Sequence, residues 1–148
     1  MTRPFQTYQR MAVSTADPLR IVVLLYEGAI KNLNQALPLI GPNPEQAAGR
    51  IARTLEIINY LRSALDHDKG GEIATNLERL YDYMRDVIAE ANIQRDAGRL
   101  REVIGLLQTL LEGWRGISQP GNHTDGEEKP SPVTPLAGPV KSVSMVVG

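Results

Sequence analysis

The sequence predicts an all-α protein whose main body, residues 17–117, is an antiparallel up-down four-helix bundle. Four segments carry apolar residues at steps of three and four, which is the spacing of one buried helix face. Between them no stretch shows the alternation of polar and apolar residues that indicates a strand. The connections are short, and short connections place consecutive helices antiparallel.

Capping residues and prolines set the expected bounds of the first two helices. We expect the first helix over residues 18–37, because Asp17 can cap it, Pro18 fits its first turn and Pro38 stops it. The second helix is expected over residues 44–67, after a proline-rich linker.

Glycines delimit the other two helices. A break is expected at residues 66–71, and the third helix follows over residues 72–93. A tight connection at residues 96–98 leads into the fourth helix, which we expect to continue to about Trp114 and to end at Gly116.

Each of the last three helices shows one apolar stripe that we expect in the core. The residues of these stripes are Ile51, Leu55, Ile58, Leu61 and Leu65; Ile73, Leu77, Leu80, Met84, Val87 and Ala91; and Leu100, Val103, Leu107, Leu110 and Trp114.

The two ends of the chain differ in composition from the bundle. Residues 1–16 include apolar side chains, and we expect them to form an N-terminal cap segment that can lie over a groove and be displaced. Residues 118–148 hold five prolines and no aromatic residue. Such a segment buries too little surface to fold alone, so we expect a disordered, solvated tail. The alternative is that residues 140–147 add as a strand to the sheet edge of a partner.

The first helix departs from a simple amphipathic pattern. On a helical wheel Ile21 and Leu24 fall on the polar side, Gly28 falls between them, and Leu25 lies at the border. Residues three and four apart are neighbours on a helix, so these four form one contiguous apolar strip. An apolar strip outside the core indicates an interface. The alternatives are cover by the protein's own N-terminal segment or chance exposure.

Several motifs appear in a fixed order along residues 5–117. They are Gln6-Thr7-Tyr8, Thr15-Ala16-Asp17-Pro18, Leu25-Tyr26-Glu27-Gly28-Ala29-Ile30, the run from Gly70 to Met84, Glu90-Ala91-Asn92, Arg101-Glu102-Val103 and Trp114. In this order and spacing the chain resembles the flagellar secretion chaperone (FliS) family. Two features depart from the family pattern, namely the long tail and the proline-rich linker at residues 38–44.

The resemblance implies a cytoplasmic, flagellin-specific export chaperone built as a four-helix bundle. Such a chaperone binds the disordered C-terminal segment of flagellin, prevents its premature polymerisation and assists flagellar type III secretion. The matching positions are Tyr8, Leu25, Tyr26, Gly28, Ala29, Asn76, Tyr81, Tyr83 and Asn92.

Together, the strip and the resemblance suggest a set of partner-binding residues, which is Tyr8, Ile21, Leu24, Leu25, Gly28, Tyr81, Tyr83 and Asn92. For the tyrosines the alternative is packing at the core boundary, and for Asn92 it is a cap at the C-terminal end of a helix.

Composition argues against several other functions. With no cysteine and only two histidines, no metal site or cofactor is expected, and His67 reads as a loop residue. A net charge of −1 disfavours nucleic acid. No apolar run is long enough to insert into a membrane, and no motif of an enzyme is found.

We expect a monomer or weak homodimer, with other flagellar export or regulatory proteins as further partners. The alternatives are a self-associating structural bundle and an adaptor that sequesters another amphipathic peptide.

Overall fold

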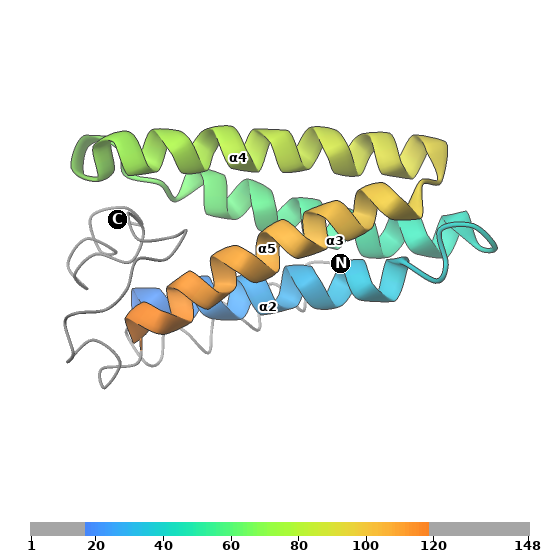
Figure 1. Ribbon diagram of the computed structural model, residues 1–148, viewed down its shortest axis with the longest axis horizontal. Coiled ribbons are helices and arrows are strands. Elements are labelled where there is room, and N and C mark those ends of the chain that lie inside the picture. Colours follow the sequence, from blue (N-terminus) through green and yellow to red (C-terminus); the bar gives the residue numbers. More distant parts are fainter. Residues whose placement is uncertain (1–16, 119–148) are drawn as a thin grey trace.

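Four helices make up the computed structural model, which describes residues 17–118 (Figure 1). They are α2 (Pro18–Ala36), α3 (Pro44–Ser63), α4 (His67–Gln94) and α5 (Ala97–Ser118). The expected cap segment and almost all of the expected tail lie outside the described residues.

The helices form a ring in which each one contacts its two neighbours. Contacts concentrate between α2 and α3, α3 and α4, α4 and α5, and α5 and α2. Successive helices run in opposite directions, so α2 begins at the same end of the bundle as α5 ends (Figure 1). This arrangement confirms the predicted antiparallel up-down bundle, with α2 and α4 diagonally opposite.

Each helix begins after an Asp or Asn whose side chain accepts a hydrogen bond from a backbone N–H of the first turn. This interaction satisfies a donor that the helix itself leaves free. The acceptor and donor pairs are Asp17 and Leu19 at 3.1 Å, Asn43 and Gln46 at 3.3 Å, Asp66 and Lys69 at 3.0 Å, and Asp96 and Gly98 at 2.9 Å. The predicted starts of α2 at Pro18 and of α3 at Pro44 are confirmed.

The bounds of the other helix ends differ from the sequence prediction. Helix α3 ends at Ser63, and α4 begins already at His67, because Asp66 caps it. Gly71 interrupts α4 with φ 53° and ψ −127°, a conformation open essentially to glycine alone. The expected break at residues 66–71 is therefore a capped turn followed by a kink.

The ends of α4 and α5 also correct two expectations. Helix α5 continues through Gly116 to Ser118, because the burial of Ile117 against the core outweighs the low helix propensity of glycine. The C-terminal cap of α4 is Arg95, in a left-handed conformation, and Asn92 lies inside the helix.

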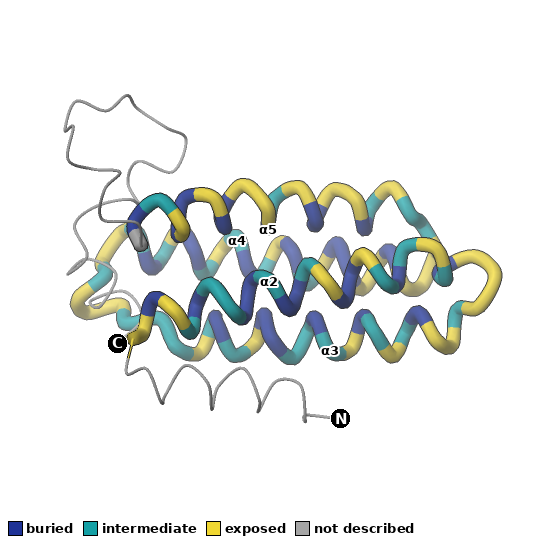
Figure 2. Tube along the Cα trace, turned by 90° about the horizontal axis from the view of Figure 1, so that it is seen from below, coloured by how far each residue is buried: buried dark blue, intermediate teal, exposed yellow. Residues whose placement is uncertain are grey.

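The core runs the length of the bundle and contains most of the predicted stripes (Figure 2). Four predicted core residues, Leu55, Leu65, Ile73 and Leu80, are half-buried and pack against its edge. The buried face of α2 lies further toward Leu25 and Gly28 than the wheel indicated. It includes Leu25, Gly28, Asn32 and Ala36, because α2 lies between two neighbours, α3 and α5.

Two buried polar side chains find partners on α2. The Asn32 side-chain amide donates to the Gly28 carbonyl at 2.9 Å, within the helix. The Thr54 hydroxyl on α3 donates to the Ala29 carbonyl at 3.1 Å, which joins the two helices.

Candidate functional site

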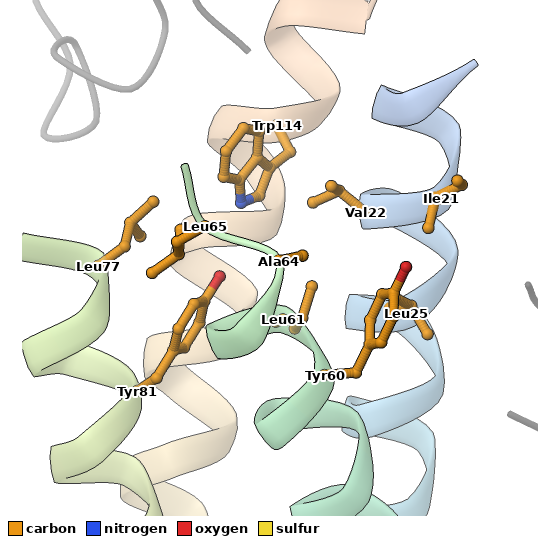
Figure 3. Close-up of a pocket in the computed structure, with 10 residues that line it drawn as sticks. All are labelled: Ile21, Val22, Leu25, Tyr60, Leu61, Ala64, Leu65, Leu77, Tyr81 and Trp114. Carbon is orange, nitrogen blue, oxygen red and sulfur yellow. The ribbon is translucent and has the colours of Figure 1, made fainter. Parts of the chain in front are cut away.

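An apolar pocket lies at the end of the bundle where α2 begins and α5 ends (Figure 3). The up-down topology brings the first turns of α2 and α4 and the last turns of α3 and α5 to this end. Its empty volume is about 320 Å³, part of which is open to solvent. The pocket is lined by Ile21, Val22, Leu25, Tyr60, Leu61, Ala64, Leu65, Leu77, Tyr81 and Trp114.

The residues that line the pocket differ in how deeply they are buried. Val22, Leu25 and Leu77 are buried. Ile21 and Leu65 are half-buried and pack against the edge of the core. Side chains at the mouth can therefore shift to admit a guest group more easily than those at the base.

Two tyrosines and one tryptophan meet beside the pocket. The hydroxyl oxygens of Tyr26 on α2 and Tyr81 on α4 lie 2.7 Å apart and share a hydrogen bond. The rings of Tyr26 and Trp114 pack at a tilt, with 6.3 Å between centroids. Tyr81 and Trp114 line the pocket directly, so this aromatic cluster forms part of its wall (Figure 3).

Burial shifts the ionisation of both tyrosines. Loss of solvent raises the pKa of Tyr26 to about 12, although its contacts with Tyr81 and Trp114 pull the value down. Burial, followed by the neighbouring Tyr26, raises the pKa of Tyr81 well above its ordinary value. The raised pKa values show that burial disfavours a negative charge at these two hydroxyls.

The Trp114 indole contributes a polar group to this wall. Its Nε1 atom is buried and has no acceptor in hydrogen-bond geometry among residues 17–118. The indole is close enough to Tyr26 to lower that pKa. Within the described residues the N–H is unpaired, because its contact with Tyr26 falls short of hydrogen-bond geometry.

The pocket continues into an open hollow around the connection between α3 and α4. The hollow shares Tyr60, Ala64 and Leu65 with the pocket. It is also lined by the polar residues 66–68. Next to it, the Arg62 guanidinium reaches Asp82 at 2.7 Å and Glu78 at 2.9 Å, which ties α3 to α4. The mouth of the pocket therefore has a polar rim on this side.

The predicted strip on α2 is only partly at the surface. Leu25 is fully buried and Gly28 is buried, so the wheel placed them too far from the core. Ile21 and Leu24 are half-buried. Of the strip, Ile21 and Leu25 reach the pocket, whereas Leu24 does not line it.

The remaining candidate residues lie apart from one another. Tyr81 lies in the pocket wall. Tyr83 is 46% exposed on α4 and donates a hydrogen bond to Glu102 on α5. Asn92 is exposed on α4, with no role as a cap. Tyr8 lies outside the described residues. The structure thus brings together Ile21, Leu25 and Tyr81 among the predicted set.

Sequence reasoning missed most of the pocket lining as a site. The missed residues are Val22, Tyr60, Leu61, Ala64, Leu65, Leu77 and Trp114. Four of them, Leu61, Leu65, Leu77 and Trp114, belong to the core stripes that the sequence predicts. The signal that could have grouped them is topological, because an up-down bundle places alternate helix ends together.

Comparison with known proteins decides the family. A family model described as flagellar protein FliS matches residues 1–121. The flagellar secretion chaperone FliS of Salmonella typhimurium is 40% identical over 109 residues, which cover 72% of this chain and 81% of that protein. The chain belongs to the FliS family.

Other relatives support this FliS assignment. The flagellar secretion chaperone FliSB of Pseudomonas aeruginosa is 39% identical over 122 residues, 78% of this chain and 96% of that protein. The FliS protein of Bacillus subtilis is 29% identical over 117 residues, 78% of this chain and 86% of that protein. The predicted resemblance is confirmed, and it supports a role as a chaperone in flagellar secretion.

Residues 17–118 hold neither a helix fit to span a membrane nor a cluster of metal-ligating side chains. None of the helices there combines the length and the apolar content needed to span a bilayer. Within the same described part of the chain, His, Asp and Glu do not gather in a group of three that could hold a metal. His67, for example, has Glu78 at 3.5 Å as its ion-pair neighbour.

Proposed function

We propose that this FliS-family chain binds the C-terminal segment of flagellin, keeps flagellin from polymerising prematurely and assists its flagellar type III secretion. The observation that carries the proposal is the apolar pocket at the end of the bundle, with the half-buried Ile21 and Leu24 beside it. The relatives named as flagellar secretion chaperones support it.

The physical requirements of such a partner fit this surface. A segment that is disordered when free loses chain entropy as it binds, so it must bury apolar side chains to compensate. An amphipathic helix does this with anchors spaced three and four residues apart. On our proposal the pocket takes one such anchor and the α2 strip takes others.

The site of action follows from the proposed task. Flagellin must be held before export, so the chaperone acts in the cytoplasm, without a cofactor or catalytic step. Other flagellar export or regulatory proteins bind the remaining surfaces of the bundle.

The other partner-binding residues suggested by the sequence remain part of the proposal, either as direct contacts or as supports of the surface. They are Tyr8, Leu25, Gly28, Tyr81, Tyr83 and Asn92.

Isothermal titration of the full chain with a peptide of the flagellin C-terminal segment tests the proposal. We expect saturable binding with a negative heat-capacity change, the mark of apolar burial. Sedimentation of the free chain should show a monomer or a weak dimer. If no heat of binding appears and the chain sediments as a tight dimer, the self-associating bundle is the better description.

Leu24→Asp tests the strip. Losing one apolar anchor of this size is worth roughly 1.5–3 kcal/mol, so peptide affinity should fall at least tenfold while helicity is retained. Asn34→Asp is the matched control, since it places the same charge at an exposed position of α2. Unfolding of the Leu24→Asp variant would assign residue 24 to the core and remove the strip.

A further inference from the structure

The aromatic cluster in the pocket wall has more hydrogen-bond donors than it can pair. The Tyr26 and Tyr81 hydroxyls and the Trp114 indole offer three donors. The two hydroxyls share one hydrogen bond at 2.7 Å, which uses one of their two protons. The indole is a donor only, so it cannot accept the second proton.

This imbalance does not depend on how the hydrogens are arranged. If the indole N–H turned towards Tyr26, a hydroxyl proton would still lack an acceptor. As the side chains stand, the Trp114 Nε1–H is unpaired as well. No other described residue accepts a hydrogen bond from Tyr26 or Tyr81. A buried donor left without a partner is unfavourable.

Water does not readily supply the missing acceptor. The space for water inside the pocket is about 10 Å³, at the lower edge of the roughly 10–15 Å³ that a single water needs. The lining around it is aliphatic or aromatic. Since neither the described residues nor water readily supplies the acceptor, a bound guest that moves the half-buried side chains at the mouth can bring it.

The surroundings also restrict the charge of that acceptor. Seven of the ten lining residues are aliphatic, and none of the ten is charged. A carboxylate in this place would lose its hydration for only one or two hydrogen bonds. The acceptor that fits is a neutral oxygen, such as a backbone carbonyl or a side-chain amide.

We infer that the pocket binds the C-terminal turn of a guest helix. Carbonyls inside a helix are already paired, and only those of the last turn are free to accept a further bond. An aliphatic side chain from that turn enters the pocket while one free carbonyl accepts from the Trp114 and tyrosine donors. This inference rests on the proposed binding of flagellin, and it places the end of one flagellin helix at Trp114.

Replacing the indole N–H alone tests the inference. Trp114 is the single tryptophan of the chain, so residue-specific incorporation of benzothienylalanine exchanges only this N–H for sulfur. We expect affinity for the flagellin peptide to fall about five- to tenfold, as for one lost hydrogen bond. Thermal unfolding of the free variant should be unchanged or slightly higher, because an unpaired donor has been removed.

Ester substitutions in the peptide backbone show which peptide carbonyl accepts the hydrogen bond. An ester carbonyl is a weaker acceptor than an amide carbonyl, so one ester position in a helix-terminal turn should weaken binding to the natural chain more than binding to the benzothienyl variant. A response to Asn or Gln substitution alone would place the acceptor on a side chain, and the helix-end assignment would fail. Thr75→Val is the control, because it removes a hydroxyl that donates to the Gly71 carbonyl outside the pocket.

Two further results would overturn the inference. Equal affinity of the natural and benzothienyl chains would show that the guest brings no acceptor. A lower melting temperature of the free variant would show that the N–H is already paired. Absence of any binding by the natural chain refutes the flagellin proposal instead, and the melting comparison then still reports whether the donor is unpaired.

Discussion

The hydroxyls of Tyr26 and Tyr81 meet at 2.7 Å inside the bundle and join α2 to the diagonally opposite helix α4. Each ring is almost wholly buried. The contact therefore crosses the interior at the level of the pocket, where the two aromatic side chains support its wall.

This tyrosine pair predicts a loss of stability at alkaline pH. The pKa of Tyr26 is raised to about 12 and that of Tyr81 also lies well above the ordinary value of 10.0. Below pH 10 the stabilisation is fully present. Above pH 10 unfolded tyrosines lose protons that the folded ones keep, so the free energy of unfolding should fall by about 1.4 kcal/mol per pH unit for each tyrosine.

Urea titrations at steps between pH 8 and pH 11.5 measure this dependence. The Tyr26→Phe/Tyr81→Phe variant provides the control, because it removes both hydroxyls and so leaves neither of them buried without its partner. Its alkaline slope should be markedly shallower, and the residual slope reports the other titrating groups. Parallel slopes for the two proteins would contradict burial of the pair.

Two glycines in helices should respond in opposite ways to alanine. Gly71 has φ 53° and ψ −127° at the kink of α4, where a β-carbon is strained. Gly71→Ala should therefore cost about 1–3 kcal/mol of unfolding free energy. Gly49 lies within α3 with open space where a β-carbon would stand, so Gly49→Ala should stabilise by about 1 kcal/mol.

Urea midpoints of the two variants, measured side by side, separate these cases. The substitution is the same in both, so any difference reports the backbone conformation. A neutral Gly71→Ala variant would mean that the kink can straighten into a continuous helix.

The sequence predicts a helix start correctly where the capping residue and a proline stand next to each other at that start. Asp17 with Pro18, and Asn43 with Pro44, cap their own helices, and these starts are confirmed. The end of α5 was predicted too early, because only tertiary packing of Ile117 shows why the helix passes Gly116.

The pocket could not be predicted in the same way. Its walls come from four helices, so no single stripe contains it. Leu25 illustrates the difficulty, since the wheel placed it at the border and the neighbours of α2 bury it fully. The unpaired Trp114 Nε1 has no sequence signature at all, because it depends on which groups surround the indole.

Filling the pocket should block partner binding without harming the fold. Ala64 caps α3 in a helical conformation that any residue can adopt, and it lines the pocket. Ala64→Leu adds bulk where the anchor of a guest would enter, so affinity for the flagellin peptide should fall at least tenfold. Thermal stability should stay within about 0.5 kcal/mol, as for most changes at partly exposed positions.

Ala52→Leu is the matched control for the filled pocket. It makes the same substitution at an exposed position of the same helix, away from the pocket. Titration calorimetry of both variants with the same peptide gives the comparison. Undiminished binding by Ala64→Leu would place the guest elsewhere on the bundle.

Deleting residues 1–14 tests the proposed N-terminal cap segment. The cut leaves Asp17, the capping residue of α2, in place, so bundle melting should change little. Peptide affinity should change more. A rise means that the segment competes for the pocket, because a self-covered site is available for only a fraction of the time. A fall means that the segment, with Tyr8, contacts the partner, and Tyr8→Ala in the full chain should then reproduce most of the loss. Unaltered affinity, with melting unchanged, would contradict both roles and leave the α2 strip and the pocket to act alone.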